Sequence, residues 1–237
     1  MRVYDLFLVK PVYPLADIVS RCMRIVNESL MNYTNKIEKY NDANWSDDPD
    51  ILYEILDKNS KGEIFSWGMI QPGYGNPIDW YIHSAALKDD GSILINLDYE
   101  TLYENFGPKT FKKSVRKTIC HETIHINQRK AMGEDFFDCI KSGYQRGLKL
   151  MEQTGNKQDL FNHYFTDPTE IMAHGHDLAF EIYHHKEKKK VMENMEGYIL
   201  TLPTLDRYIK RGFPLTHYAT EAVIKYSNEY LRGMFGQ

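Results

Sequence analysis

Two histidines four residues apart, with a glutamate directly after the first, constrain this chain more than any other feature. They are His121 and His125 in the stretch KTICHETIHINQRK, and the glutamate is Glu122. Apolar residues recur at four-residue spacing just ahead of them, over 111–119, which predicts one long helix over about 108–131. On a helix, positions i and i+4 share a face, so both imidazoles can direct a nitrogen to one common point.

This pattern suits a particular kind of chemistry. Zinc binds imidazole nitrogens and lowers the pKa of a bound water to near neutral. Glu122 points to the adjacent side of the helix, where it can take the proton of such a water. The order His-Glu-x-x-His therefore indicates metal-assisted hydrolysis, with Zn²⁺ as cofactor, His121 and His125 as ligands and Glu122 as general base. The alternative is a polar helix face with two unrelated histidines.

Charge and cysteine usage limit the partners and the compartment. The net charge is −4 with both signs interspersed, so we expect neither a nucleic acid partner nor a membrane-seeking basic helix. The three cysteines, Cys22, Cys120 and Cys139, show no CxxC spacing, which fits a reducing compartment. The apolar run near the start is too short for a secretion signal, and no stretch approaches membrane-spanning length. We therefore expect a cytoplasmic protein, a setting that includes the host cytoplasm for a phage-encoded chain.

The spacing of apolar residues changes twice along the chain. Helical spacing of apolar residues covers most of residues 1–62. Between residues 63 and 98, three short apolar runs are separated by the turn sequences QPGYGNP and KDDG, which predicts a small antiparallel meander. Residues 99–237 return to helical patterns. The predicted fold class is α+β, with a small antiparallel sheet packed on a mainly helical body, in one domain over residues 1–237. After the histidine helix, further helices are predicted over about 134–153, 168–185, 188–199 and 216–232.

HETIH inside a helix that follows a β-region resembles the zincin group of zinc metallopeptidases. In that fold the active-site helix lies under a twisted sheet, and the edge strand of the sheet binds extended substrate through main-chain hydrogen bonds. The metzincin branch needs a glycine and a third histidine where this chain has Gln128 and Ala131, so that branch is excluded. The resemblance is to the gluzincin-like branch, which takes a glutamate from a later helix as the third ligand. It covers about 90 residues, from the last predicted strand to that later helix.

Glu170 is the predicted third ligand. It lies in the segment FTDPTE, where Asp167 is the predicted helix cap and Pro168 the first helical residue, 45 residues after His125. The small Ala173 leaves room where two helices must approach closely.

The rivals for the third ligand are His174, His176 and His163, since a site of three histidines would also bind zinc. A gluzincin-like pattern places an acid four residues after the glutamate ligand, to orient a zinc histidine. This chain has His174 there, so we expect a different partner, Asp177, on the same helix face.

The expected activity is that of a zinc-dependent metallopeptidase acting on a peptide or protein. An oxyanion stabiliser is also expected, and Tyr164 and His217 are the candidates. The edge strand that would hold the substrate is either 82–87 or 92–97. Two alternatives have the same motif: a zinc hydrolase of a non-peptide substrate, and a zincin-fold binding or structural protein with a vestigial site.

Overall fold

The computed structural model describes residues 10–38, 49–70, 85–88, 90–98, 108–133 and 145–235. The chain divides into two compact units. One runs from Pro14 to Ile126, and the other combines Met1–Tyr13 with Asn127–Gln237. The division falls inside α5 (Pro108–Met132), which is one uninterrupted helix. The expectation of a single domain stays a prediction.

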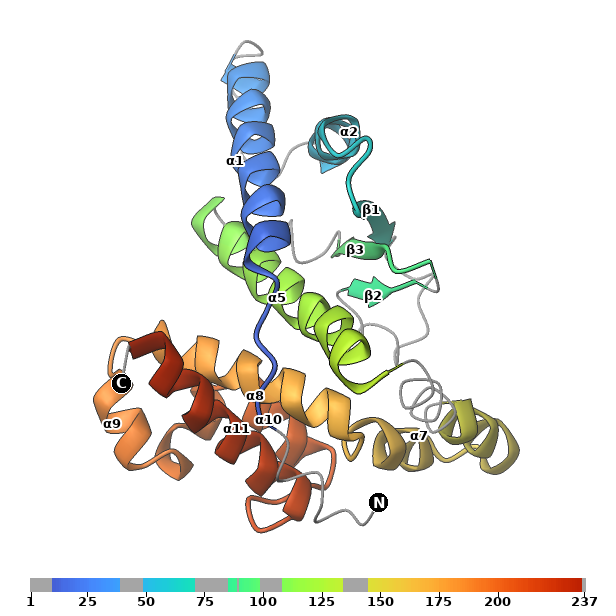
Figure 1. The fold of residues 1–237 in the computed structure, drawn as a ribbon, viewed down its shortest axis with the longest axis vertical. Coiled ribbons are helices and arrows are strands. Elements are labelled where there is room, and N and C mark those ends of the chain that lie inside the picture. Colours follow the sequence, from blue (N-terminus) through green and yellow to red (C-terminus); the bar gives the residue numbers. More distant parts are fainter. Residues whose placement is uncertain are drawn as a thin grey trace. The chain divides into compact units, whose positions relative to one another are not determined.

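The first unit has a hydrophobic core to which helices and strands both contribute. The helices α1 (Ala16–Glu38) and α2 (Pro49–Asn59) lie within residues 1–62, where the apolar spacing predicted helices (Figure 1). A side-chain hydrogen bond from Asn59 of α2 to Ser29 of α1, at 2.9 Å, joins the two helices, and one from Trp67 to Ser60, at 2.6 Å, joins the first strand of the sheet to the residue after α2. The predicted stripe on α5 is confirmed as part of this core, with Phe111, Val115 and Ile119 all buried in it.

The sheet of this unit is mixed. Its strands are β1 (Phe65–Ile70), β2 (Ala85–Leu87) and β3 (Ile93–Asp98), in the spatial order β1-β3-β2. β1 and β3 run parallel, whereas β2 and β3 run antiparallel. The prediction of an antiparallel sheet is therefore wrong. The period-two apolar pattern that predicts a strand is the same for either direction of its neighbour, so it could not reveal the parallel pair.

The turn between β2 and β3 is the one that KDDG predicted. Gly91 has a φ of 80°, and its N–H donates to the carbonyl oxygen of Lys88 at 2.9 Å. Glycine adopts this left-handed conformation without a steric cost, which explains its position there. The other predicted turn, QPGYGNP, lies outside the described residues.

The second unit is helical throughout its described part. Besides a helix over residues 145–154, its elements are α7 (Lys157–Tyr164), α8 (Pro168–Tyr183), α9 (Lys188–Glu193), the 3-10 helix η2 (Glu196–Thr201), α10 (Pro203–Lys210) and α11 (Tyr218–Phe235) (Figure 1).

Helix α8 forms the centre of this unit. Every residue from Ile171 to Ile182 is buried, although the segment contains histidines and carboxylates. α8 packs along α11 (Figure 1). Gly175 is at their closest approach, because a Cβ atom there would lie 2.5 Å from the Cβ of Tyr226 and 3.3 Å from the carbonyl oxygen of Val223. The close contact of the two helices thus depends on a residue without a side chain.

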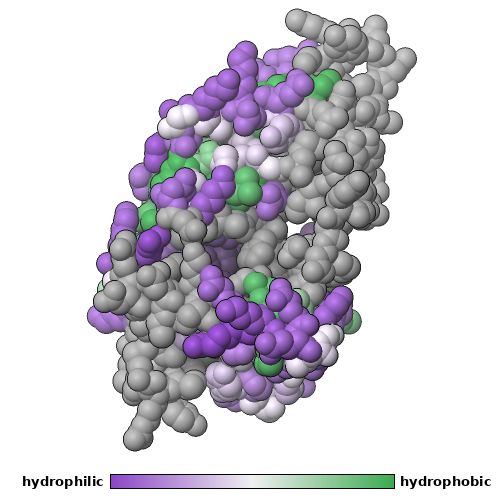
Figure 2. Space-filling model, turned by 90° about the vertical axis from the view of Figure 1, so that its right-hand side faces the viewer, coloured by the Kyte–Doolittle hydropathy of each residue, from purple (hydrophilic) through white to green (hydrophobic). Residues whose placement is uncertain are grey.

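The described surface is mostly polar on the face that Figure 2 shows, where hydrophobic residues form small separate areas. Among the described residues, no helix is both long enough and apolar enough to cross a membrane.

We predict that Gly175→Ala destabilises the protein. The added methyl group meets the Cβ atom of Tyr226 and the backbone oxygen of Val223. Neither atom can rotate away, so α8 and α11 must separate. We expect the free energy of unfolding to fall by about 1–3 kcal/mol in denaturant titrations. Gly233→Ala is the matched control, because its methyl group would meet the far end of the Tyr13 ring, which can move. An equal loss in both variants would contradict the prediction.

Candidate metal centre

Helix α5 places the two histidines of the motif together, as their spacing predicted. The ring centroids of His121 and His125 are 4.9 Å apart, with the ring planes at 76°. One turn further along, the side chain of Gln128 is fully buried and donates to the carbonyl oxygen of Thr169 at 3.1 Å. The same helix thus continues from the histidines to a contact with the residue that precedes Glu170.

The start of α8 also has its predicted local structure. Asp167 is the N-cap, with its carboxylate accepting from the backbone N–H of Thr169 at 2.8 Å, and Pro168 is in the first turn. This cap fixes where the helix begins, which places Glu170 in the first turn.

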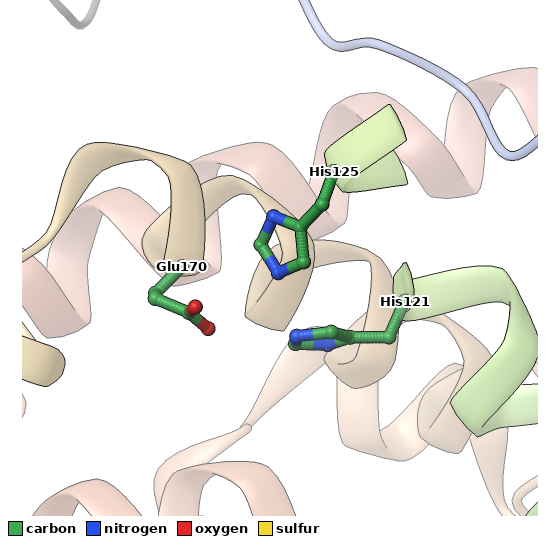
Figure 3. Close-up of side chains that lie close together, drawn as sticks. All are labelled: His121, His125 and Glu170. Atoms are coloured by element: carbon green, nitrogen blue, oxygen red, sulfur yellow. The ribbon is translucent and has the colours of Figure 1, made fainter. Parts of the chain in front are cut away.

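His121, His125 and Glu170 form a group that could hold a metal ion. One ligand atom from each lies within 4.8 Å of the other two. Figure 3 shows the carboxylate of Glu170 and the two imidazole rings directed toward one another. His125 is buried, whereas Glu170 keeps partial exposure.

The chemistry of this group fits zinc. Two imidazole nitrogens and one carboxylate oxygen are a common protein ligand set for that metal, which leaves a fourth position for water or substrate. The site would have a net charge of about +1, because the carboxylate offsets one of the two charges of the metal.

A second group shares His121 with the first. It joins His121, His174 and Asp177, whose ligand atoms also lie within 4.8 Å of one another. Glu170, His174 and Asp177 follow one another at spacings of four and three residues, so they lie on one face of α8. This agrees with the expectation that Asp177 lies near a histidine of the motif, on the same face as Glu170.

The rival histidines differ in their surroundings. His174 is buried, and its Nδ1 lies 2.9 Å from the hydroxyl oxygen of Tyr208. His176 packs against the ring of Tyr230, with centroids 5.1 Å apart. Of the three rivals, only His174 belongs to a ligand group formed by the described residues.

Two ionisable groups beside the centre have shifted pKa values. Burial, and then the charge of Glu170, raise the pKa of Asp167 to about 6. Burial, and then Glu170, also raise the pKa of Tyr208 well above its ordinary value. Glu170 is a cause of both shifts, so its negative charge acts on both groups, and a bound cation would offset that charge.

The three residues expected to act in catalysis lie in different settings. Glu122 is buried next to His121 in α5. Tyr164 is buried at the end of α7, with its ring edge-on to His174 at 5.6 Å. His217 precedes α11, where its Nδ1 accepts from the N–H of Ala219 at 3.2 Å. The catalytic roles of these residues stay predictions.

The contacts of Gln128 with Thr169 and of Tyr208 with His174 were not predicted. Gln128 follows His125 by three positions, so its place on the same helix face was a usable signal. Tyr208 is one of 17 tyrosines and reaches His174 from 34 residues away, so nothing local distinguished it.

We predict that the titration of Asp167 depends on Glu170 in the metal-free protein. Glu170→Gln removes one cause of the raised pKa, so the pKa of Asp167 should fall below about 6 in an NMR titration. A raised carboxyl pKa favours the folded state most below the ordinary value of 3.8, and this contribution is lost as the pH rises through about 6. This loss of folding stability with rising pH should be smaller in Glu170→Gln. Asp90, whose pKa is lowered by hydrogen bonds from Ser92, should titrate identically in both proteins.

Comparisons with protein-family models, with curated proteins and with solved structures found no match to this chain.

Proposed function

We propose that this protein is a zinc-dependent metallopeptidase, with His121, His125 and Glu170 as metal ligands and Glu122 as general base. The observation that carries the proposal is the meeting of two histidines from α5 with a glutamate from the first turn of α8. Residues 45 positions apart in the chain come together there with the donor set that catalytic zinc sites use.

The roles of the chain's own residues follow from their chemistry. A bound zinc ion would supply a Lewis acid that polarises the scissile carbonyl and lowers the pKa of water. Glu122 accepts the proton of the attacking water on its carboxylate and passes it to the departing amine. Asp177, which has a ligand atom within 4.8 Å of one of His121, would orient that ring by accepting from its N–H, and the other ring nitrogen would then hold the metal.

A peptide is the proposed substrate because the sheet offers a suitable edge. The order β1-β3-β2 leaves β2 at the edge of the described sheet and β3 in its centre. An extended peptide can pair with an edge strand through main-chain hydrogen bonds.

We predict that the protein binds one zinc ion per chain and that His121→Ala and His125→Ala each lose it. His121→Ala and His125→Ala each remove one of three ligands, and Glu170→Gln removes the only anionic one, so metal content after dialysis should fall sharply in all three. Metal analysis of the purified proteins provides the measurement. His184→Ala is the control, because this exposed histidine at the end of α8 lies outside both ligand groups. Full metal content in a His121→Ala, His125→Ala double variant would rule the site out.

We predict that Glu122→Gln keeps the metal but loses turnover. The amide has the shape of the carboxylate and cannot accept the proton, so hydrolysis should slow by about 10²-fold or more. The measurement is the cleavage rate of a peptide library by zinc-loaded protein, with metal content determined on the same samples. Unchanged turnover would reject Glu122 as general base. If the zinc-loaded protein cleaves no peptide at all, a non-peptide substrate or a binding function takes the place of peptidase activity.

A further inference from the structure

A second group of ligands adjoins the proposed zinc site. It consists of His121, His174 and Asp177, and one ligand atom from each lies within 4.8 Å of the other two. His174 and Asp177 both come from α8 and are 1% and 6% exposed. In the proposed reaction His174 has no role and Asp177 only orients the His121 ring. The group as a whole therefore has no assigned function.

The two groups define two positions for an ion. Nitrogen or oxygen ligands of one zinc ion can be no further apart than about 4.4 Å, twice the bond length. Within each group the separations are close to this limit, but among the described residues the five ligands do not form a single group. An ion held by His125 and Glu170 is therefore not also held by His174 and Asp177. His121 belongs to both groups.

The imidazole of His121 can serve both positions, because its two nitrogens lie on different edges of the ring. When the first ion binds one nitrogen, the other carries the N–H proton of the neutral ring. A second ion that binds Asp177 displaces this proton to solvent and takes its place on the nitrogen. The bond from nitrogen to the second ion replaces the N–H bond, and His121 then bridges the two ions.

The surroundings of His174 select the nitrogen that it can offer. The hydroxyl oxygen of Tyr208 lies 2.9 Å from Nδ1, so a hydrogen bond already occupies that edge of the ring. Nε2, on the other edge, is the nitrogen with which His174 can bind an ion. The ring of Phe165 lies nearly parallel to the imidazole at 5.9 Å, with 24° between the planes, which restricts its rotation.

The ligand types indicate the class of cation. Two imidazole nitrogens and one carboxylate oxygen suit Zn²⁺ and neighbouring transition-metal ions such as Co²⁺, whereas Mg²⁺ and Ca²⁺ prefer oxygen ligands. A dication at this position would also offset the negative charge of the buried Asp177 carboxylate.

We propose that His121, His174 and Asp177 bind a second transition-metal dication, more weakly than the first ion is bound. Two ligands of this position are buried, whereas Glu170 keeps partial exposure, so the second ion must lose more of its hydration. The two dications also repel each other. The second ion lies across the His121 ring from the first, so it fixes that ring and does not share the attacking water. The inference rests on the proposed zinc site, because His121 serves both positions.

Equilibrium dialysis of the metal-free protein against increasing Co²⁺ concentrations counts the ions directly. We expect the unmodified protein to bind two equivalents, and subsequent dialysis against metal-free buffer to leave one. Saturation at one equivalent would overturn the second position and leave the proposed zinc site intact. If no cobalt binds, the proposed zinc site and the second position both fail.

Asp177→Asn and His174→Gln test the second position by itself. Asparagine keeps an acceptor oxygen for the N–H of His121, and a neutral amide is a poor ligand for these ions. Each variant should bind one equivalent and keep it through dialysis. His125→Ala should also bind one equivalent, which dialysis removes because it occupies the weaker position. Two equivalents in both Asp177→Asn and His174→Gln would overturn the proposal.

His176→Gln is the matched control for His174→Gln. His176 lies on the same helix, is 3% exposed, and belongs to neither ligand group of the described residues. The control should bind two equivalents, as the unmodified protein does. Loss of one equivalent from His176→Gln as well would mean that any change inside α8 removes the second ion, and would contradict the assignment of His174 as its ligand.

Discussion

The hydrogen bond from the Gln128 side chain to the carbonyl oxygen of Thr169 is the contact on which the metal centre depends. It is buried, and it joins the end of α5 to the first turn of α8. His125 lies about one turn before Gln128 on α5. Thr169 directly precedes Glu170 in the first turn of α8. Leaving this buried carbonyl without a hydrogen-bond partner would cost about 1–3 kcal/mol, which disfavours a shift of α5 along α8.

Helix α8 carries a stripe of ionisable residues through the interior of its unit. Glu170, His174, Asp177 and Glu181 follow at spacings of four, three and four residues, which places them on one face. The last of them has a structural role, because its two carboxylate oxygens accept from the N–H and the hydroxyl group of Thr204, at 3.1 and 2.8 Å. The other three turn toward the ligand groups that include His121. Burying such groups is costly unless they have partners, and a cation bound at the candidate centre would be such a partner.

Local signals account for the parts of the structure that the sequence predicted correctly. The long helices α1, α5, α8 and α11 have apolar residues at helical spacing over several turns. This pattern is visible in the sequence whatever the tertiary packing is. The short helices α7 and α10, of eight residues each, offer too few turns for that spacing to emerge. Local signals do not determine the sheet, because the parallel pairing of β1 with β3 depends on the path of the chain between them.

The sequence by itself determined the two features of the centre that depend on neighbours within one turn. The spacing of His121 and His125 places both rings on one helix face, and the Asp167 cap sets the start of the helix that carries Glu170. Only the tertiary structure decided that Glu170 meets the histidines and that Tyr208 reaches His174. The physical reason is the separation along the chain of the residues that interact. A helix face and a cap are fixed by backbone geometry over a few residues, whereas the ligand group and the contact of Tyr208 with His174 depend on helices that are distant in the chain.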